Sequence, residues 1–244
     1  MTITQSYIID AIITEAMGKP DQGLMNTLSG PHMVAVMNES NAGLCSRLRS
    51  FPRQQTWDHE PYASVHGMLR NLEYQNTINA SWGLAAVNSL LNKGITGPEI
   101  KIQELILYLG ENKNVAIIGH FPFVERMGQD FKNFWILELS PKANDIPEKM
   151  KNHILPLADL IAITATSLLN NSLGEILNLT RKNAVKIVLG PSTPMAACLL
   201  DMGIDYLGGT LVRDHQKAFA GIKKGLPFRK LDGVSYTIMG KKHF

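Results

Sequence analysis

The sequence has few of the features that mark secreted, membrane-spanning or nucleic-acid-binding proteins. Its 244 residues include only 2 cysteines, Cys45 and Cys198, which are too far apart to form a disulfide framework or a thiolate metal cluster. No run of about 18 apolar residues occurs, so we expect no membrane span. The amino terminus lacks the basic and apolar stretches of a secretory signal. A net charge of +3 is small for a nucleic-acid-binding protein. We therefore expect a cytoplasmic protein that binds neither membranes nor nucleic acids.

Common catalytic and metal-binding fingerprints are also missing. The chain contains no Cys-x-x-Cys, His-x-Glu, His-Glu-x-x-His or Gly-x-Ser-x-Gly pattern. These absences exclude zinc ribbons, zincin-type metalloproteases and the nucleophile elbow as explanations of its function. What the sequence does have is 45% hydrophobic and 18% charged residues, the balance of a globular protein with a sizeable core.

The first part of the chain predicts a small α+β domain. Helical periodicity covers residues 3–17 and 79–92, and a further helix runs from Pro98 to Gly110. Two short extended stretches, 33–37 and 43–48, flank a polar turn and predict a hairpin. We place the domain boundary in the Gly-containing segment between the last two helices, which gives domains of residues 1–96 and 97–244.

After Gly110 the pattern changes to short β-branched runs that alternate with helical stretches. This alternation predicts an open, mostly parallel sheet covered by helices on both faces. The expected strands are 114–118, 133–138, 158–163, 184–189 and 204–208, and the expected helices lie near 122–129, 146–152, 171–181, 194–201 and 214–222.

Three of the predicted strands run directly into loops of small and polar residues. The first loop begins Gly119-His120-Phe121-Pro122, the second contains Thr164, Thr166 and Ser167, and the third is Gly190-Pro191-Ser192-Thr193-Pro194. The carboxyl ends of parallel strands meet at one edge of a sheet, where helix amino termini offer free N–H groups to ligands. We expect the function to lie at this edge.

His120 and Glu138 are the candidates for chemistry in the first of these loops and beside it. A histidine there can bind a metal or carry a proton near neutral pH, or it can simply bond a backbone carbonyl. Glu138 closes the second strand 19 positions after Gly119, a spacing at which acidic residues bond the ribose of adenosine ligands. However, the first loop lacks the Gly-x-Gly-x-x-Gly fingerprint, and the alternative is that Glu138 ends the strand without a nucleotide partner.

The hydroxyl groups of the other two loops have two interpretations. Thr164, Thr166 and Ser167 can contact a ligand or cap the following helix. Gly190, Ser192 and Thr193 form a loop suited to a carboxylate or phosphate.

Two further features are weaker candidates for chemistry. Cys198 is either a thiol favoured as thiolate by a helix start or a small core residue. The Asp214-His215 pair either completes a metal site with His120 or begins a helix.

Several stretches together resemble a known family. They are Asn79 to Asn88, Val115-Ala-Ile-Ile-Gly-His-Phe-Pro-Phe123, Leu189-Gly-Pro-Ser-Thr-Pro194 and Gly203 to Thr210. These stretches are similar to the heavy-metal chelation family DUF364, whose members are often preceded by a second domain, DUF4213. The resemblance implies an amino-terminal domain similar to the enolase amino-terminal domain, then a Rossmann-like domain, with the active site in the cleft between them.

The resemblance also implies which residues line that cleft. They are Gly119 to Pro122, Thr164 to Ser167 and Gly190 to Thr193. Where this chain has Cys198, the similar sequences commonly have an apolar residue, so Cys198 is not part of a shared mechanism.

Three functional hypotheses follow, and the third is a binding or scaffolding module whose cleft is only the seam between the two domains. In the first, the protein binds a small anionic or metal-bearing ligand in the interdomain cleft, as in heavy-metal chelation or handling. His120 then serves as metal ligand or acid–base group, and Ser192 and Thr193 hold an anion. In the second, it is an enzyme, for example a transferase, that uses a nucleotide or S-adenosylmethionine bound by Glu138. We expect a homodimer, because that state is common among proteins of this kind.

Overall fold

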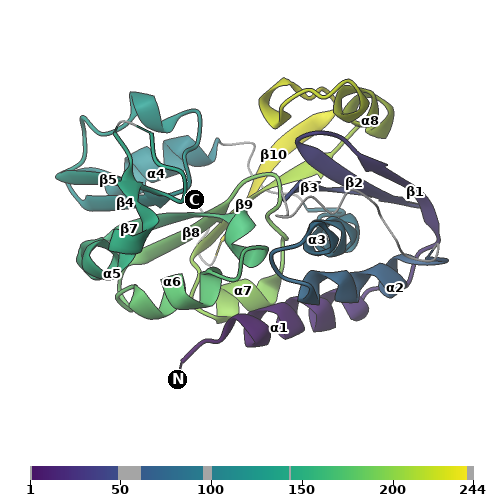
Figure 1. Cartoon of the computed structure of the whole chain (residues 1–244), viewed down its shortest axis with the longest axis horizontal. Helices are drawn as coiled ribbons and strands as arrows, with labels where there is room; N and C mark the ends of the chain where they lie inside the picture. Colours follow the sequence, from purple (N-terminus) through teal and green to yellow (C-terminus); the bar gives the residue numbers. More distant parts are fainter. Residues whose placement is uncertain (1, 49–61, 96–100, 143, 241–244) are drawn as a thin grey trace.

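The chain folds around two sheets that lie side by side (Figure 1). The computed structural model describes residues 2–48, 62–95, 101–142 and 144–240. Residues 2–95 carry a 3-stranded sheet, and residues 101–240 carry a 7-stranded sheet. The predicted boundary after residue 96 lies outside the described residues. No helix of the described chain has both the length and the apolar character needed to cross a bilayer.

The amino-terminal part wraps an antiparallel sheet around one buried helix. Its elements are α1 (Gln5–Met17), β1 (Leu24–Ser29), β2 (Met33–Asn38), β3 (Ala42–Ser46), α2 (Val65–Leu69), a 3₁₀ helix (Arg70–Glu73) and α3 (Ile78–Leu91). The predicted hairpin is β2 and β3, whose turn is fixed by Asn38. The side-chain oxygen of Asn38 accepts hydrogen bonds from the backbone N–H groups of Ser40 and Asn41. This Asx-type turn explains why the polar run between the strands folds back so tightly.

Helix α3 is the centre of the amino-terminal part. Every residue from Ala80 to Leu91 is buried, so the helix has no solvent face. Two glycines permit this close packing. A Cβ atom on Gly43 of β3 would lie 2.1 Å from the Ala85 carbonyl oxygen, and one on Gly83 would lie 2.1 Å from the Leu72 nitrogen. Because those contacts are with backbone atoms, only glycine lets the helix approach both neighbours.

The carboxyl-terminal part is an α/β sheet with strand order β10-β9-β8-β7-β4-β5-β6. All neighbouring strands pair in parallel except β9 and β10, which are antiparallel. The elements are α4 (Ile102–Gly110), β4 (Asn114–Ile118), β5 (Asn133–Glu138), β6 (Ile146–Pro147), α5 (Lys151–Ile154), β7 (Leu160–Thr164), α6 (Leu173–Leu179), β8 (Val185–Leu189), α7 (Ala197–Asp201), β9 (Tyr206–Val212), α8 (His215–Lys223) and β10 (Val234–Gly240). The predicted Rossmann-like α/β sheet with a smaller α+β part is confirmed.

Alternate residues of the central strands enter two different cores. Val115 and Ile117 of β4 pack with Leu105 and Ile106 of α4. Ala116 and Ile118 of the same strand belong to the larger core, which also includes residues of α1, α3 and α6. Both faces of the sheet are therefore covered, which is why its strands read as continuous apolar runs in the sequence.

Several of the helices and strands differ in detail from the sequence predictions. The helix expected near 122–129 is a 3₁₀ turn of 3 residues, Val124–Arg126. The helix expected at 146–152 begins with the edge strand β6 and a 3₁₀ turn. Strands β1, β6 and β10 were not predicted. β1 and β10 are edge strands with partly exposed side chains, and β6 holds only 2 residues, so none shows a buried apolar run.

The two parts are joined by buried amide side chains at the end of α3. Asn92 Nδ2 donates to the carbonyls of Thr193 (3.0 Å) and Thr210 (3.2 Å), and Asn92 Oδ1 accepts from the Met195 N–H (2.9 Å). One turn earlier, Asn88 Nδ2 donates to the carbonyls of Leu44 (2.8 Å) and Ser192 (3.2 Å). These bonds fix the loop after β8 against α3.

Replacing Asn92 should therefore destabilise the whole chain. In Asn92→Ala, two carbonyls and one N–H lose their partner at a site where the asparagine is only 4% exposed. We expect the free energy of unfolding, measured in urea, to fall by about 2–4 kcal/mol. The control Asn152→Ala removes an exposed amide on α5 and should change stability by less than about 0.5 kcal/mol. Equal stabilities for the two variants would contradict the prediction.

Candidate functional site

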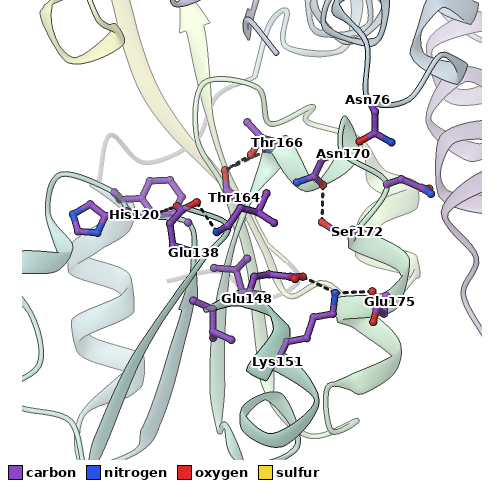
Figure 2. A pocket seen from close by; sticks show the side chains of 16 residues that line it. Asn76, His120, Glu138, Glu148, Lys151, Thr164, Thr166, Asn170, Ser172 and Glu175 are labelled. Atoms are coloured by element: carbon purple, nitrogen blue, oxygen red, sulfur yellow. Dashed lines mark hydrogen bonds and ion pairs between the residues drawn. The ribbon is translucent and has the colours of Figure 1, made fainter. Parts of the chain in front are cut away.

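A crevice opens at the carboxyl edge of the large sheet, where the strand order reverses. β4 pairs with β5 on one side and with β7 on the other, so the loops after β4 and β7 leave the sheet in different directions. Such switch points are the usual ligand sites of open α/β sheets. The crevice has a volume of about 520 Å³. Its polar lining, drawn in Figure 2, comprises Asn76, His120, Glu138, Glu148, Lys151, Thr164, Thr166, Asn170, Asn171, Ser172 and Glu175.

Glu138 lies at the end of β5 and is held by backbone N–H groups. Its Oε2 accepts from the His120 N–H at 2.8 Å, and its Oε1 accepts from the Leu139 N–H at 2.8 Å. The carboxylate thus joins the loop after β4 to the end of β5. A carboxylate has about four acceptor positions, so Glu138 keeps capacity for a ligand on the crevice side. The predicted bond to a ribose stays a prediction.

The far wall of the crevice carries a charged triad. Lys151 Nζ lies 2.5 Å from Glu148 Oε1 and 2.7 Å from Glu175 Oε2 (Figure 2). Burial alone would lower the pKa of Lys151, but its hydrogen bonds to the two carboxylates raise that pKa above its ordinary value. The lysine is therefore charged and already neutralised. Together with Glu138, the described lining has three carboxylates against one ammonium group, so the crevice is net negative.

Neutral amides and hydroxyls complete the lining. Asn76 and Asn171 both have left-handed backbones, with φ of 62°, although they are not glycines. Residues in this uncommon conformation cluster at functional sites. Thr164 and Thr166 bond each other through their hydroxyls at 2.9 Å, and Thr164 Oγ1 also accepts from the Thr166 N–H, as in the predicted cap. Ser167, in contrast, is fully buried and does not line the crevice.

His120 lines the crevice, and two carboxylates that are not part of the lining hold its imidazole. Its Nδ1 lies 2.9 Å from Asp145 Oδ1, and its Nε2 lies 3.4 Å from Glu125 Oε1. Burial would raise the pKa of Asp145, but the Lys142 N–H and the His120 ring lower it below its ordinary value. Asp145 therefore stays ionised and orients the ring. In Figure 2 the ring lies at the margin of the view, apart from the threonines. Its predicted role as acid–base group or metal ligand stays a prediction.

The third predicted loop lies next to the crevice and is used largely for packing. Ser192 is 1% exposed, and its Oγ accepts from the Ser46 N–H at 2.9 Å. Thr193 is fully buried. Pro122, Gly190 and Ser192 line a second cavity, and Phe121 contributes to both cavities. The loops are thus brought together, with Ser192 at the wall of the second cavity and Thr193 buried behind it, and their predicted anion role stays a prediction.

Neither cysteine is placed to bind a heavy metal in the crevice. Burial raises the pKa of Cys45 to about 12, despite its hydrogen bonds to Ser192 and Ser81. Burial, together with the hydrogen bond to Glu15, raises the pKa of Cys198 to about 12. Glu15 also accepts from the Ala197 and Cys198 N–H groups, so its charge opposes the helix-start effect. Asp214 accepts from the Lys217 N–H as the cap of α8, as the helix-start interpretation expects.

The described residues therefore do not fit direct chelation of a soft heavy metal. Soft metals prefer thiolate ligands, and neither Cys45 nor Cys198 lines the crevice. Outside the gaps in the described chain, no three His, Cys, Asp or Glu side chains lie close enough together to hold a metal ion.

The fold and the crevice define a Rossmann-like α/β protein with a polar crevice at its switch point. Residues 101–239 match the family model DUF364, described as "Putative heavy-metal chelation", and the chain belongs to this family. It is similar to an uncharacterized protein of Methanocaldococcus jannaschii, with 26% identity over 156 residues. That match spans 60% of each chain.

Two crystal structures share the fold. Both are proteins of unknown function from the DUF364 family, one from Desulfitobacterium hafniense DCB-2 and one from Pyrococcus horikoshii. The first has a TM-score of 0.84 and 24% identity, and the comparison covers 96% of this chain and 98% of that one. The second has a TM-score of 0.84 and 22% identity, with 96% and 99% covered. At these identities the likeness shows the fold alone.

Sequence reasoning missed several crevice residues. Asn76 and the carboxylates Glu148 and Glu175 come from segments that showed no recognisable motif. Asp145, which orients His120, lies in a short connection between two strands. One usable signal was Glu148-x-x-Lys151, a spacing at which opposite charges meet within one helical turn.

The environment of the two thiols predicts that they react slowly with alkylating reagents. With a pKa of about 12, Cys198 and Cys45 are almost wholly protonated at pH 8. We expect iodoacetamide to modify both at least about a hundredfold more slowly than in the urea-unfolded chain, because the thiolate is the reactive form. Glu15→Gln should speed the modification of Cys198 and leave that of Cys45 unchanged, so Cys45 serves as an internal control. The modification of each cysteine is measured by peptide mass spectrometry. A native Cys198 that reacts as fast as the unfolded chain would contradict this environment.

Proposed function

We propose that the protein binds a small, positively charged compound in the crevice, either an organic cation or a metal complex. In a metal complex, the groups that coordinate the metal belong to the bound compound and not to the protein. The observation that carries this proposal is the charge of the lining, in which Lys151 is paired and Glu138 remains as a further carboxylate. Asparagine and threonine side chains add donors and acceptors that can orient polar groups of the ligand. The proposal agrees with the family description without requiring protein thiolates.

Within this proposal the parts of the site have separate tasks. Glu138 and the Glu148–Lys151–Glu175 triad attract and hold the positive charge. Asn76 and Asn171 lie at the rim, where their exposed amides can contact a ligand. His120 is the proton carrier of the site, since Asp145 fixes Nδ1 and only the exposed Glu125 faces Nε2. An imidazole ordered in this way can exchange a proton with a ligand that approaches Nε2.

Cobalt(III) hexaammine is a suitable probe, because its metal already has a complete ligand shell and can be held only by charge and hydrogen bonds. We expect saturable binding by calorimetry. Glu138→Gln and Glu175→Gln should each weaken the affinity by about threefold to tenfold, as expected for loss of one nearby charge. The matched control is Glu104→Gln, which removes an exposed carboxylate of α4 outside the crevice. Equal weakening in all three variants, or no binding, would overturn the proposal.

A second candidate is an enzyme that uses an adenosine-type cofactor, and the position of Glu138 favours it. Glu138 ends β5, the strand beside β4, and faces the crevice. This is where acidic residues bond ribose in related topologies. The connection from β4 to β5 holds only the 3₁₀ turn Val124–Arg126, so no helix start is available there for a pyrophosphate. A phosphate-free, cationic cofactor such as S-adenosylmethionine therefore fits better than NAD or ATP.

Thermal unfolding can test this candidate. S-adenosylmethionine at saturating concentration should raise the melting temperature by about 2–5 °C, whereas NAD and ATP should leave it unchanged. Glu138→Gln should remove most of that shift, because the ribose hydroxyls lose a charged acceptor. A flat response to all three compounds would eliminate the adenosine-type cofactor while leaving the cobalt probe as a separate test of the crevice.

A further inference from the structure

A second cavity, which we call the groove, lies beside the crevice and differs from it in character. It has a volume of about 820 Å³. One wall is the start of α4 with the loop after β4, and the opposite wall is formed by β9, β10 and the 3₁₀ helix Phe228–Lys230. Phe121, Thr164 and Thr166 line both cavities and separate them.

The charges of the groove are opposite to those of the crevice. Its charged residues in the described chain are Lys101, Arg126 and Arg229, and no carboxylate lines it there. All three side chains are exposed, and none forms an ion pair with another described residue. Cations around one cavity that has no acid among its described lining residues give it a positive potential that attracts anions.

The surface between these cations is apolar and aromatic. The rings of Phe121 and Phe123 are stacked, with centroids 5.3 Å apart and planes at 10°. On the other wall, Phe228 and Tyr236 meet edge to face at 5.8 Å. Tyr236 is 47% exposed, although large apolar side chains usually find cover. Aromatic walls with free faces suit a flat ring, which gains from stacked and edge contacts.

A buried hydroxyl in the groove lacks a partner. Thr210 lies opposite Tyr236 in the β9–β10 ladder, so both side chains are on the same face of the sheet. Thr210 lines the groove and is only 5% exposed, and its Oγ1 makes no hydrogen bond to a described residue. Buried hydroxyls are normally hydrogen-bonded, so this one is an unusual polar group behind the wall of the groove.

We propose that the groove is a second binding site and that it takes a small aromatic carboxylate. The ring lies among Phe123, Phe228 and Tyr236, and the carboxylate faces Arg126 and Arg229. This inference does not depend on the ligand of the crevice. If both sites are filled, the two ligands lie on either side of Phe121, which makes the carboxyl edge of the sheet a place where a cationic and an anionic compound meet.

Calorimetry with 1-naphthoate tests this proposal, and 1-naphthylmethylamine serves as the cationic analogue of similar size. We expect 1-naphthoate to bind and the amine not to bind. The double variant Arg126→Gln/Arg229→Gln should weaken the naphthoate affinity at least tenfold, and higher salt should weaken the wild-type affinity as well. Because both arginines are exposed and unpaired in the described chain, their loss should leave the melting temperature unchanged.

The matched control is Lys230→Gln, which removes the charge next to Arg229 in the same 3₁₀ helix but outside the groove. It should retain the wild-type affinity for 1-naphthoate. The crevice variant Glu175→Gln should also retain it, so a failure here can be told apart from a failure of the proposed crevice function. Equal binding of the acid and the amine, or full affinity in the double arginine variant, would overturn the proposal.

Discussion

The hydrogen bonds of buried asparagines at the end of α3 are the constraint on which the site depends. A buried carbonyl or N–H without a partner is costly, so the loop after β8 can only lie where Asn88 and Asn92 satisfy its backbone. The helix itself cannot shift, because Gly43 and Gly83 allow its backbone to contact both neighbours directly. The amino-terminal part therefore acts as a rigid support for one loop of the large sheet. The position of Ser192, and with it one wall of the groove, is set by residues about 100 positions earlier in the chain.

The other two loops are fixed against this one by equally local constraints. Gly119 has φ of 101°, and a Cβ atom there would lie 3.1 Å from Thr164 Cβ, so the loops after β4 and β7 are in close contact. Glu138 then clamps the start of the first loop through the His120 N–H. Phe121 lies between the two cavities. Its ring is close to the third loop, because a Cβ atom on Gly190 would lie 3.9 Å from Phe121 Cε1. The separation of crevice and groove thus follows from the backbone geometry of a few strand ends.

The elements that carry a buried apolar run or a helical periodicity were the ones that the sequence could predict. The buried strands β4, β5, β7 and β8 and the helix α3 appear as apolar runs or helical periodicity, and the family resemblance added the Rossmann-like order. His120, Glu138, Thr164 and Thr166 were found because strand ends are ligand sites in this topology. Asp145, Glu175 and Asn76 were not found, because their roles depend on contacts across the fold. The anion role predicted for Ser192 and Thr193 stays a prediction, and the sequence did not indicate that buried asparagines hold this loop against α3.

The charges of the two cavities say more about function than the fold does, because this fold supports many activities. An acidic crevice and a basic, aromatic groove share one wall at the edge of the sheet. Each would repel the ligand of the other, so the two sites could be filled at the same time without competing for the same compound. Two ligands of opposite charge would also attract each other across Phe121. This arrangement is better suited to bringing two small molecules together than to storing a bare metal ion, for which the described residues offer neither thiolates nor a compact group of ligands.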